Sequence, residues 1–144
     1  GKVILKGILD QEDAKLALNV GADAIIVSNH GGRQLDGAES AIRSLPKILD
    51  AVGDKIEVHM DSGIRSGQDV LKALALGAKG TYIGRSFVYG LGAMGQIGVT
   101  KALEIIQNEL ETSMALCGCR SVDELSRDIL CIPADFSGNW AQGV

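Results

Sequence analysis

Residues 24–33 read AIIVSNHGGR, so four apolar residues lead directly into a polar loop that contains two adjacent glycines. The apolar run is β-branched and does not alternate with polar residues, which is typical of a strand buried on both faces of a parallel sheet. In parallel α/β folds, functional residues gather in the loops that follow the carboxyl ends of the strands. This stretch therefore predicts both the fold class and the place where the chemistry should lie.

Three other short apolar runs have the same character, at Val3–Leu5, Ile56–Met60 and Thr81–Ile83. A helical pattern follows each of the four runs, and this alternation predicts parallel strands joined by right-handed crossovers. The first expected helix covers residues 11–20 after an Asp10 cap, and the second, which Pro46 interrupts or restarts, ends near Gly53. The next two cover residues 67–76, after a Ser66 cap, and residues 97–116. A last helix is expected from the capping box at Ser121 to about Leu130.

Two architectures accommodate four βα units: a small doubly wound sheet, or part of a (β/α)₈ barrel. A complete barrel needs eight units and typically about 250 residues, whereas this chain has 144 residues. Four units correspond to half a barrel, and the chain begins almost directly on a strand, as if a first half were missing. We expect the half-barrel to span residues 1–130 and a C-terminal tail to span residues 131–144.

Composition excludes several classes of function. The chain has 14 Lys+Arg against 18 Asp+Glu and 3% aromatic residues, which is unfavourable for binding nucleic acid. No apolar run approaches the ~20 residues of a transmembrane helix, so membrane contact is not indicated. The three cysteines form no CxxC pair, which argues against a disulfide framework or a structural zinc site and favours the cytoplasm.

Each of the four expected strands ends beside residues that can carry chemistry. Lys6 follows the first strand, and His30 and Arg33 follow the second. A neutral imidazole near a fixed guanidinium could take a proton from a carboxylate substrate that the arginine holds. The loops after the third and fourth strands, at residues 61–65 and 84–85, place glycine and arginine before a helix start, a combination that favours a phosphate site.

Other residues are expected to have structural roles. Residues 90–95 match G-x-G-x-x-G, but this dinucleotide motif should join a strand to a helix and be followed by a second strand ending in an acid. Here one long helix follows, so a nicotinamide-binding domain is a weak alternative. The remaining residues expected to pack are His59, within a strand pattern, Cys117 and Cys119, after a helix end, and Tyr82, Tyr89 and Trp140.

Together these segments resemble a known family. The nonapeptide SNHGGRQLD at residues 28–36, with Lys6 before it and DSGIR at 61–65 and Gly84-Arg85 after it, is similar to the FMN-dependent L-2-hydroxy-acid dehydrogenases and oxidases. That family includes L-lactate dehydrogenases, lactate and glycolate oxidases and mandelate dehydrogenases. The likeness covers about residues 3–130 and implies the C-terminal half of a (β/α)₈ TIM barrel with FMN across its C-terminal face.

The resemblance also implies roles for single residues. His30 would be the active-site base and a substrate contact, and Arg33 would anchor the substrate carboxylate. Lys6 would lie beside the N1–C2=O edge of the flavin. The residues expected to bind FMN are Lys6, Ser28, Asp61, which would bond the ribityl hydroxyls, Ser62, Gly63, Ile64, Arg65, Gly84 and Arg85.

The sequence departs from the family at two positions and in length. The family usually reads Asp-Gly-Gly-Ile/Val-Arg-Arg-Gly in the third loop, whereas Ser62 and Ser66 stand for a glycine and an arginine here. One cationic contribution to the phosphate site is therefore lost. The first barrel half, which carries further substrate and flavin contacts in the family, is absent.

We therefore expect an FMN-dependent oxidation of an L-2-hydroxy acid, most simply L-lactate, to the 2-oxo acid. This chain would be the C-terminal half of the enzyme and inactive alone, with the missing N-terminal half or a second copy as its partner. The full-length protein would be cytoplasmic or peripheral to the inner membrane. The alternative from another class is a non-catalytic flavin- or phosphate-binding half-barrel, or a remnant that pairs with another chain.

Overall fold

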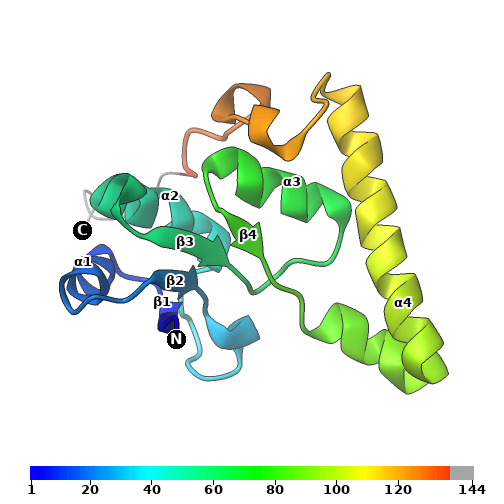
Figure 1. Ribbon diagram of the computed structural model, residues 1–144, viewed down its shortest axis with the longest axis horizontal. Helices are drawn as coiled ribbons and strands as arrows, with labels where there is room; N and C mark the ends of the chain where they lie inside the picture. Colours follow the sequence, from blue (N-terminus) through cyan, green and yellow to red (C-terminus); the bar gives the residue numbers. More distant parts are fainter. Residues whose placement is uncertain (137–144) are drawn as a thin grey trace.

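The computed structural model describes residues 1–136 and contains one sheet of four parallel strands in the order β1-β2-β3-β4 (Figure 1). The strands are β1 (Ile4–Ile8), β2 (Ala24–Val27), β3 (Glu57–Met60) and β4 (Gly80–Thr81). Every neighbouring pair is parallel. Neighbours in sequence are thus neighbours in space, which confirms the predicted succession of βα units.

Three helices cover one face of this sheet. They are α1 (Gln11–Asn19), α2 (Ala41–Val52) and α3 (Gly67–Leu76). Leu45 and Ile48 of α2 are fully buried against Ile25 and Val27 of β2 in a core to which α1 and α3 contribute alanines and Leu76. Helix packing on one side of the sheet therefore explains Ile25 and Val27, but not Ala24 and Ile26, which point to the other face.

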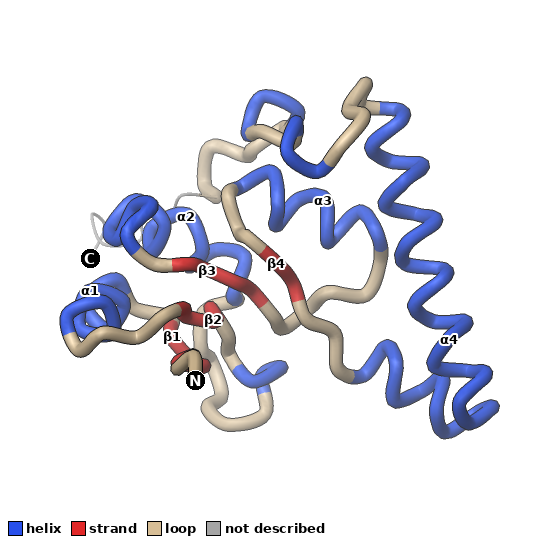
Figure 2. The backbone as a smooth tube through the Cα atoms, viewed as in Figure 1, coloured by secondary structure: helices blue, strands red, loops and turns tan. Residues whose placement is uncertain are grey.

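On the opposite face of the sheet, none of the helices in residues 1–136 is packed (Figure 2). Alternate residues point there, because successive side chains of a strand lie on opposite faces. Lys6, Ile26, His59 and Gly80 are in register across the four strands on this face. Ile4, which lies two residues before Lys6 on the same face, is 46% exposed.

The helix ends follow local rules that the sequence predicts correctly. The Asp10 side chain accepts hydrogen bonds from the N–H groups of Glu12 and Asp13 at the start of α1. Ser66 forms a capping box with Asp69 at the start of α3, and Gly77, with a left-handed φ of 119°, ends that helix. These caps set where each helix leaves the strand-end loop before it.

The fourth helix differs from the prediction. α4 spans Arg85–Leu116 rather than 97–116, and it is bent at Met94 and Gly95, whose backbone is not helical. Its two segments cross so closely that a Cβ at Gly90 would meet the backbone of Gly98. The glycines at 90–95 thus serve a helix crossing within α4, not a strand-to-helix turn for a dinucleotide.

Two further helix predictions are wrong. Pro46 lies inside α2 and does not interrupt or restart it. The predicted helix from Ser121 to Leu130 is two 3₁₀ turns, Val122–Glu124 and Arg127–Ile129, and Ser121 makes no capping bond. The Glu124 carboxylate that would complete the capping box instead binds the Arg120 N–H and guanidinium, at 2.8 and 3.1 Å.

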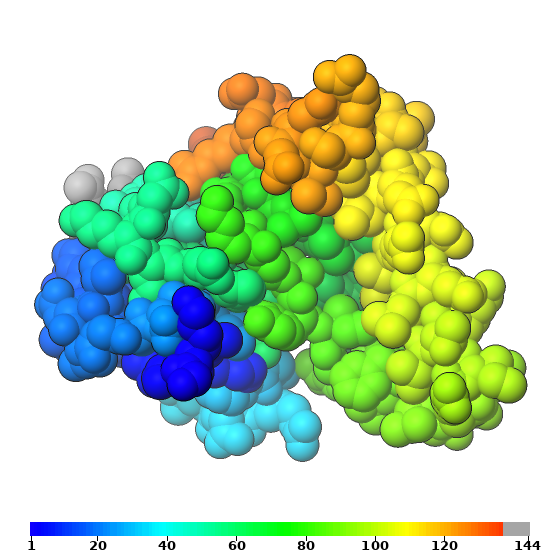
Figure 3. Space-filling model, in the orientation of Figure 1, coloured from blue at the N-terminus to red at the C-terminus, as the bar shows by residue number. Residues whose placement is uncertain are grey.

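The two 3₁₀ turns are placed by packing rather than by a helical period. Leu125 and Ile129 lie against a small second core formed by Leu71 of α3 and Met114 of α4. In the space-filling view, these turns (orange) lie at the top of the molecule next to the C-terminal end of α4 (yellow; Figure 3). Most of the predicted tail, including Trp140, lies outside the described residues.

The strand ends are also shifted from the prediction. β1 continues to Ile8, beyond the expected Leu5, and its register with β2 slips at a bulge between Lys6 and Ile8. β4 is Gly80–Thr81, so Tyr82 and Ile83 belong to the loop. Within the described residues, no helix has the length and hydrophobicity needed to cross a membrane.

Candidate active site

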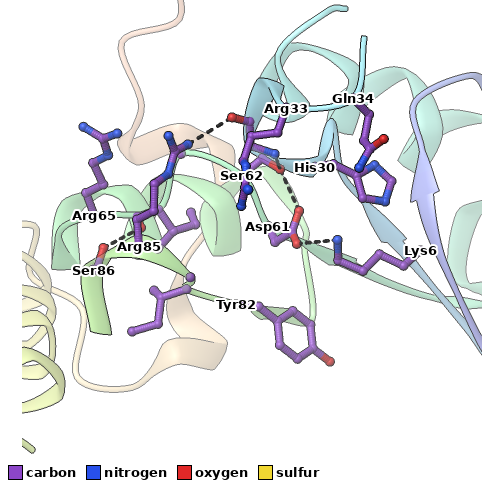
Figure 4. Close-up of a pocket in the computed structure, with 15 residues that line it drawn as sticks. Lys6, His30, Arg33, Gln34, Asp61, Ser62, Arg65, Tyr82, Arg85 and Ser86 are labelled. Carbon is purple, nitrogen blue, oxygen red and sulfur yellow. Dashed lines mark hydrogen bonds and ion pairs between the residues drawn. The ribbon is translucent and has the colours of Figure 1, made fainter. Parts of the chain in front are cut away.

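A cavity of about 390 Å³ lies at the carboxyl ends of the four strands (Figure 4). The loops after β2, β3 and β4 contribute to its wall, and β1 contributes Lys6 from within the strand, as expected for parallel strands whose ends meet at one edge. The lining residues are Lys6, His30, Gly31, Arg33, Gln34, Asp61, Ser62, Gly63, Ile64, Arg65, Tyr82, Ile83, Gly84, Arg85 and Ser86.

An ion pair between β1 and β3 lies at the centre of this wall. The Lys6 Nζ is 3.0 Å from Asp61 Oδ2, and it also donates to Ser28 Oγ at 3.1 Å. Burial of the Asp61 carboxyl raises its pKa, but hydrogen bonds from Ser28, Ser62 and Lys6, with the Lys6 charge, outweigh burial and hold the pKa below its usual value. Asp61 is therefore held as a carboxylate beside an ammonium group.

The loop after β2 has an unusual backbone. His30, Gly31 and Gly32 have φ values of 56°, 69° and 71°, all in the left-handed region. Glycine adopts this region without steric cost, but for His30 it is strained. The loop is closed by Asn29, whose side chain accepts from the N–H of Gly32 at 3.1 Å.

The His30 ring lies against the bulge in β1. A Cβ on Gly7 would lie 2.6 Å from Cε1 of His30, so the ring occupies space that only glycine leaves open at this position. Gly7 also has a φ of 101°. Figure 4 shows the imidazole at the Lys6 side of the cavity, next to Gln34. Bulges of this kind redirect side chains next to active sites.

The other end of the cavity is cationic. Arg65 precedes α3, and Arg85 begins α4, whose N-cap Gly84 has no side chain to satisfy the first N–H groups. Arg85 Nη2 donates to the Gly31 carbonyl at 3.0 Å, and Ser86 Oγ donates to the Ile64 carbonyl at 3.3 Å. Two guanidinium groups and a helix N-terminus thus converge on one end of the cavity, an arrangement suited to a phosphate group.

The structure brings together nearly all of the residues predicted to form the site. Ser28 is the exception among them, because it is 1% exposed and lies beneath the wall, where its hydroxyl contacts Lys6. The Ile64 side chain is 4% exposed and packs into the core. Ile64 therefore lines the cavity through its main chain.

Sequence reasoning missed Gln34, Tyr82, Ile83 and Ser86 as lining residues. Tyr82, expected only to pack, is 42% exposed and lines the cavity. The centroid of its ring also lies 5.7 Å from that of the His59 ring. Its place directly after β4 was the available signal. His59 lies within β3 and outside the cavity wall, and residues 1–136 contain no cluster of His, Cys, Asp or Glu able to hold a metal.

A parallel sheet with helices on one face and an arginine-lined cavity at its strand ends is the arrangement found in part of an α/β-barrel enzyme. The chain belongs to the FMN-dependent dehydrogenase family, since the sequence model of that family matches residues 1–132.

Curated relatives agree with this family. An L-lactate dehydrogenase from Caulobacter sp. (strain K31) is 55% identical over 130 residues, which is 90% of this chain and 34% of that protein. The 2-hydroxyacid oxidase 2 of Bos taurus is 53% identical over 128 residues, 89% of this chain and 36% of the relative. The chain therefore spans about a third of the length of the curated relatives it matches.

Solved structures give the same result for the fold. The structure of mandelate oxidase with benzoyl-formic acid superposes with a TM-score of 0.84 and 52% identity, over 88% of this chain and 38% of that one. A mandelate oxidase variant with a monooxide FMN adduct matches equally well, at a TM-score of 0.84. The four βα units are thus a fragment of the FMN-dependent TIM barrel, as predicted.

Proposed function

We propose that this chain supplies the cofactor-phosphate site and the proton-accepting base of an enzyme that oxidises an L-2-hydroxy acid, with L-lactate as the expected substrate. One observation carries the proposal: a single cavity gathers His30 and Arg33 with the Lys6–Asp61 pair and an arginine-lined anion site. The L-lactate dehydrogenases and 2-hydroxyacid oxidases among the relatives support it.

The residues of the cavity fit FMN. Arg65, Arg85 and the first N–H groups of α4 suit the phosphate, and the Lys6 ammonium at the other end suits the electron-rich edge of the flavin ring. Asp61, between them, offers acceptor oxygens to ribityl hydroxyls. At about 390 Å³, the cavity is within the usual ~300–1,000 Å³ of ligand sites.

When bound, FMN would accept a hydride, which is the hydrogen on the substrate carbon together with two electrons. Arg33 holds the substrate carboxylate through its planar guanidinium, which orients the 2-hydroxyl toward His30. His30 takes the hydroxyl proton. Lys6, kept in place by Asp61 at 3.0 Å, would place its ammonium group beside the flavin ring, where it favours negative charge.

We infer that the rest of the barrel, in the same protein or in a second copy of this chain, completes the site. The sheet face opposite α1, α2 and α3 supports this, because no helix of the described residues lies on it and Ile4 on that face is 46% exposed. The isolated chain should then bind FMN mainly through the phosphate and should not turn over. The three free cysteines favour the reducing cytoplasm.

The test uses the complete enzyme, in which this chain is joined to the rest of the barrel. The enzyme is mixed with L-lactate in the absence of oxygen, and the rate of flavin reduction is measured in a single turnover. His30→Gln should slow reduction by about 10²–10⁴-fold and leave FMN content unchanged, because it removes a positioned base and no phosphate contact. His59→Gln is the control, since His59 lies outside the cavity wall. Reduction of the His30→Gln flavin at the wild-type rate would show that His30 is not the base.

A second arm separates cofactor binding from catalysis. FMN should bind the isolated chain far more tightly than riboflavin, which lacks the phosphate, and Arg85→Ala should remove most of that difference. Equal binding of FMN and riboflavin to the unmodified chain would contradict the assignment of the phosphate end. Tight FMN binding without any reduction by 2-hydroxy acids in the complete enzyme would favour a non-catalytic flavin-binding barrel.

A further inference from the structure

Ser62 has a backbone conformation that serine rarely adopts. Its φ is 69°, and among residues 1–136 only His30 shares a positive φ without being glycine. A glycine at position 62 would adopt this conformation without strain. Such strain persists only where the surrounding contacts hold the residue in place.

The Ser62 hydroxyl joins two strand-end loops. It donates to Asp61 Oδ1 at 2.8 Å and accepts from the Gly31 N–H at 3.0 Å. The Ser28 hydroxyl, 3.4 Å away, accepts the N–H of His30 at 3.1 Å. The two hydroxyls thus receive the consecutive N–H groups of the turn that carries the imidazole. Figure 4 shows Ser62 beside Asp61 and the His30 loop.

Gly31 is held from its other side as well. Its carbonyl accepts from Arg85 Nη2 at 3.0 Å, and a Cβ on Gly31 would lie 3.0 Å from that same nitrogen. Loss of the Ser62 bond would leave the turn held mainly by Ser28 and Arg85. Ser62 is thus the direct bridge from the Gly31 N–H to the Asp61 carboxylate.

We propose that Ser62 is a positioning residue for His30, and that its hydroxyl fixes the His30–Gly31 peptide relative to the Lys6–Asp61 pair. This inference rests on the proposed function, in which His30 is the base. A hydroxyl has one hydrogen to donate, and that of Ser62 is directed to Asp61. The Ser62 hydroxyl therefore acts on the protein rather than as a donor to the cofactor.

Two substitutions separate the hydroxyl from the backbone strain. Ser62→Ala removes the hydroxyl and keeps the strain, whereas Ser62→Gly removes both. In the complete FMN-loaded enzyme, both variants should slow flavin reduction at saturating L-lactate by roughly 10- to 100-fold, because small displacements of a base cost this much. The dissociation constant for L-lactate and the FMN content should stay near wild type.

A second readout does not depend on activity. Hydrogen–deuterium exchange of the peptide containing Gly31, measured on the complete protein without FMN, should be faster in both variants and unchanged in Ser113→Ala, whose hydroxyl bonds within α4. Wild-type reduction in Ser62→Gly would show that the hydroxyl has no positioning role, as would unchanged exchange. Loss of FMN from both variants would instead identify Ser62 as a direct cofactor contact and overturn the proposal.

One pair of results would separate the positioning role of Ser62 from the proposed function. These results are faster exchange in both variants and no flavin reduction by L-2-hydroxy acids in the wild-type enzyme. In that case the Ser62 hydroxyl holds the turn, and the proposed function is wrong.

Discussion

Gly7→Ala should disable His30 without touching the anion-binding end of the cavity. Gly7 forms the bulge in β1 with a φ of 101°, and an added Cβ would lie 2.6 Å from Cε1 of His30. Carbon atoms in contact are normally separated by about 3.5–4.0 Å. The imidazole must therefore move by roughly 1 Å, or the bulge must reshape.

A displacement of about 1 Å at a catalytic group costs on the order of 10²-fold in rate. Flavin reduction by L-lactate in the complete enzyme, measured in a single turnover, should fall by that factor. FMN content should not change, because Arg65 and Arg85 lie at the other end of the cavity. The substitution should also destabilise the fold by about 1–3 kcal/mol through the left-handed backbone.

Gly21→Ala separates these two effects. Gly21 has a φ of 82°, yet a Cβ there would have no neighbour within 4 Å. It should therefore lower stability by a similar amount and leave the reduction rate unchanged. If Gly7→Ala reduces its flavin as fast as Gly21→Ala, the His30 ring does not depend on the space above Gly7, and the reasoning fails.

Two further predictions concern stability. The lowered pKa of Asp61 means that its contribution is complete above the unfolded-state pKa of about 3.9 and is lost as the pH falls through the folded-state value. Urea unfolding measured from pH 6 to pH 2 should thus lose less stability on acidification in Asp61→Asn, and parallel profiles would contradict this. A Cβ on Gly67 would meet the α4 backbone at Leu110, so Gly67→Ala should cost about 1–3 kcal/mol in urea unfolding. Gly92→Ala, in open space within α4, should instead be neutral or stabilising, and equal effects of the two would refute the close approach of α3 and α4.

Most residues of the candidate site were predictable because they follow short apolar runs, although Lys6 lies inside β1 rather than after it as predicted. Lys6, His30 and Asp61 each come after a short apolar run, and parallel strands bring such positions to one edge. The same rule applied to β4 would have found Tyr82, which was interpreted as a packing residue. Placing the end of β4 at Thr81 would have put Tyr82 in the strand-end loop and therefore in the cavity wall.

One error has a tertiary cause and another a local one. The start of α4 at Arg85 and its bend at Gly95 depend on the crossing of Gly90 and Gly98, which no local period encodes. The capping-box pattern at Ser121 is genuine in sequence, but Glu124 finds a stronger partner in Arg120. A local signal is lost where a charged group has a better partner nearby.

By itself, the sequence determined the parallel α/β class, the helix caps and the loops that hold the site, because hydrophobic periodicity and capping are local physics. Only the tertiary structure decided how those loops interlock. The left-handed turn at His30, its ring above the Gly7 bulge, and the Ser62 hydroxyl shared by Asp61 and Gly31 all join residues from different βα units. Such contacts exist only once the strands have paired in register, so no single segment of the chain contains them.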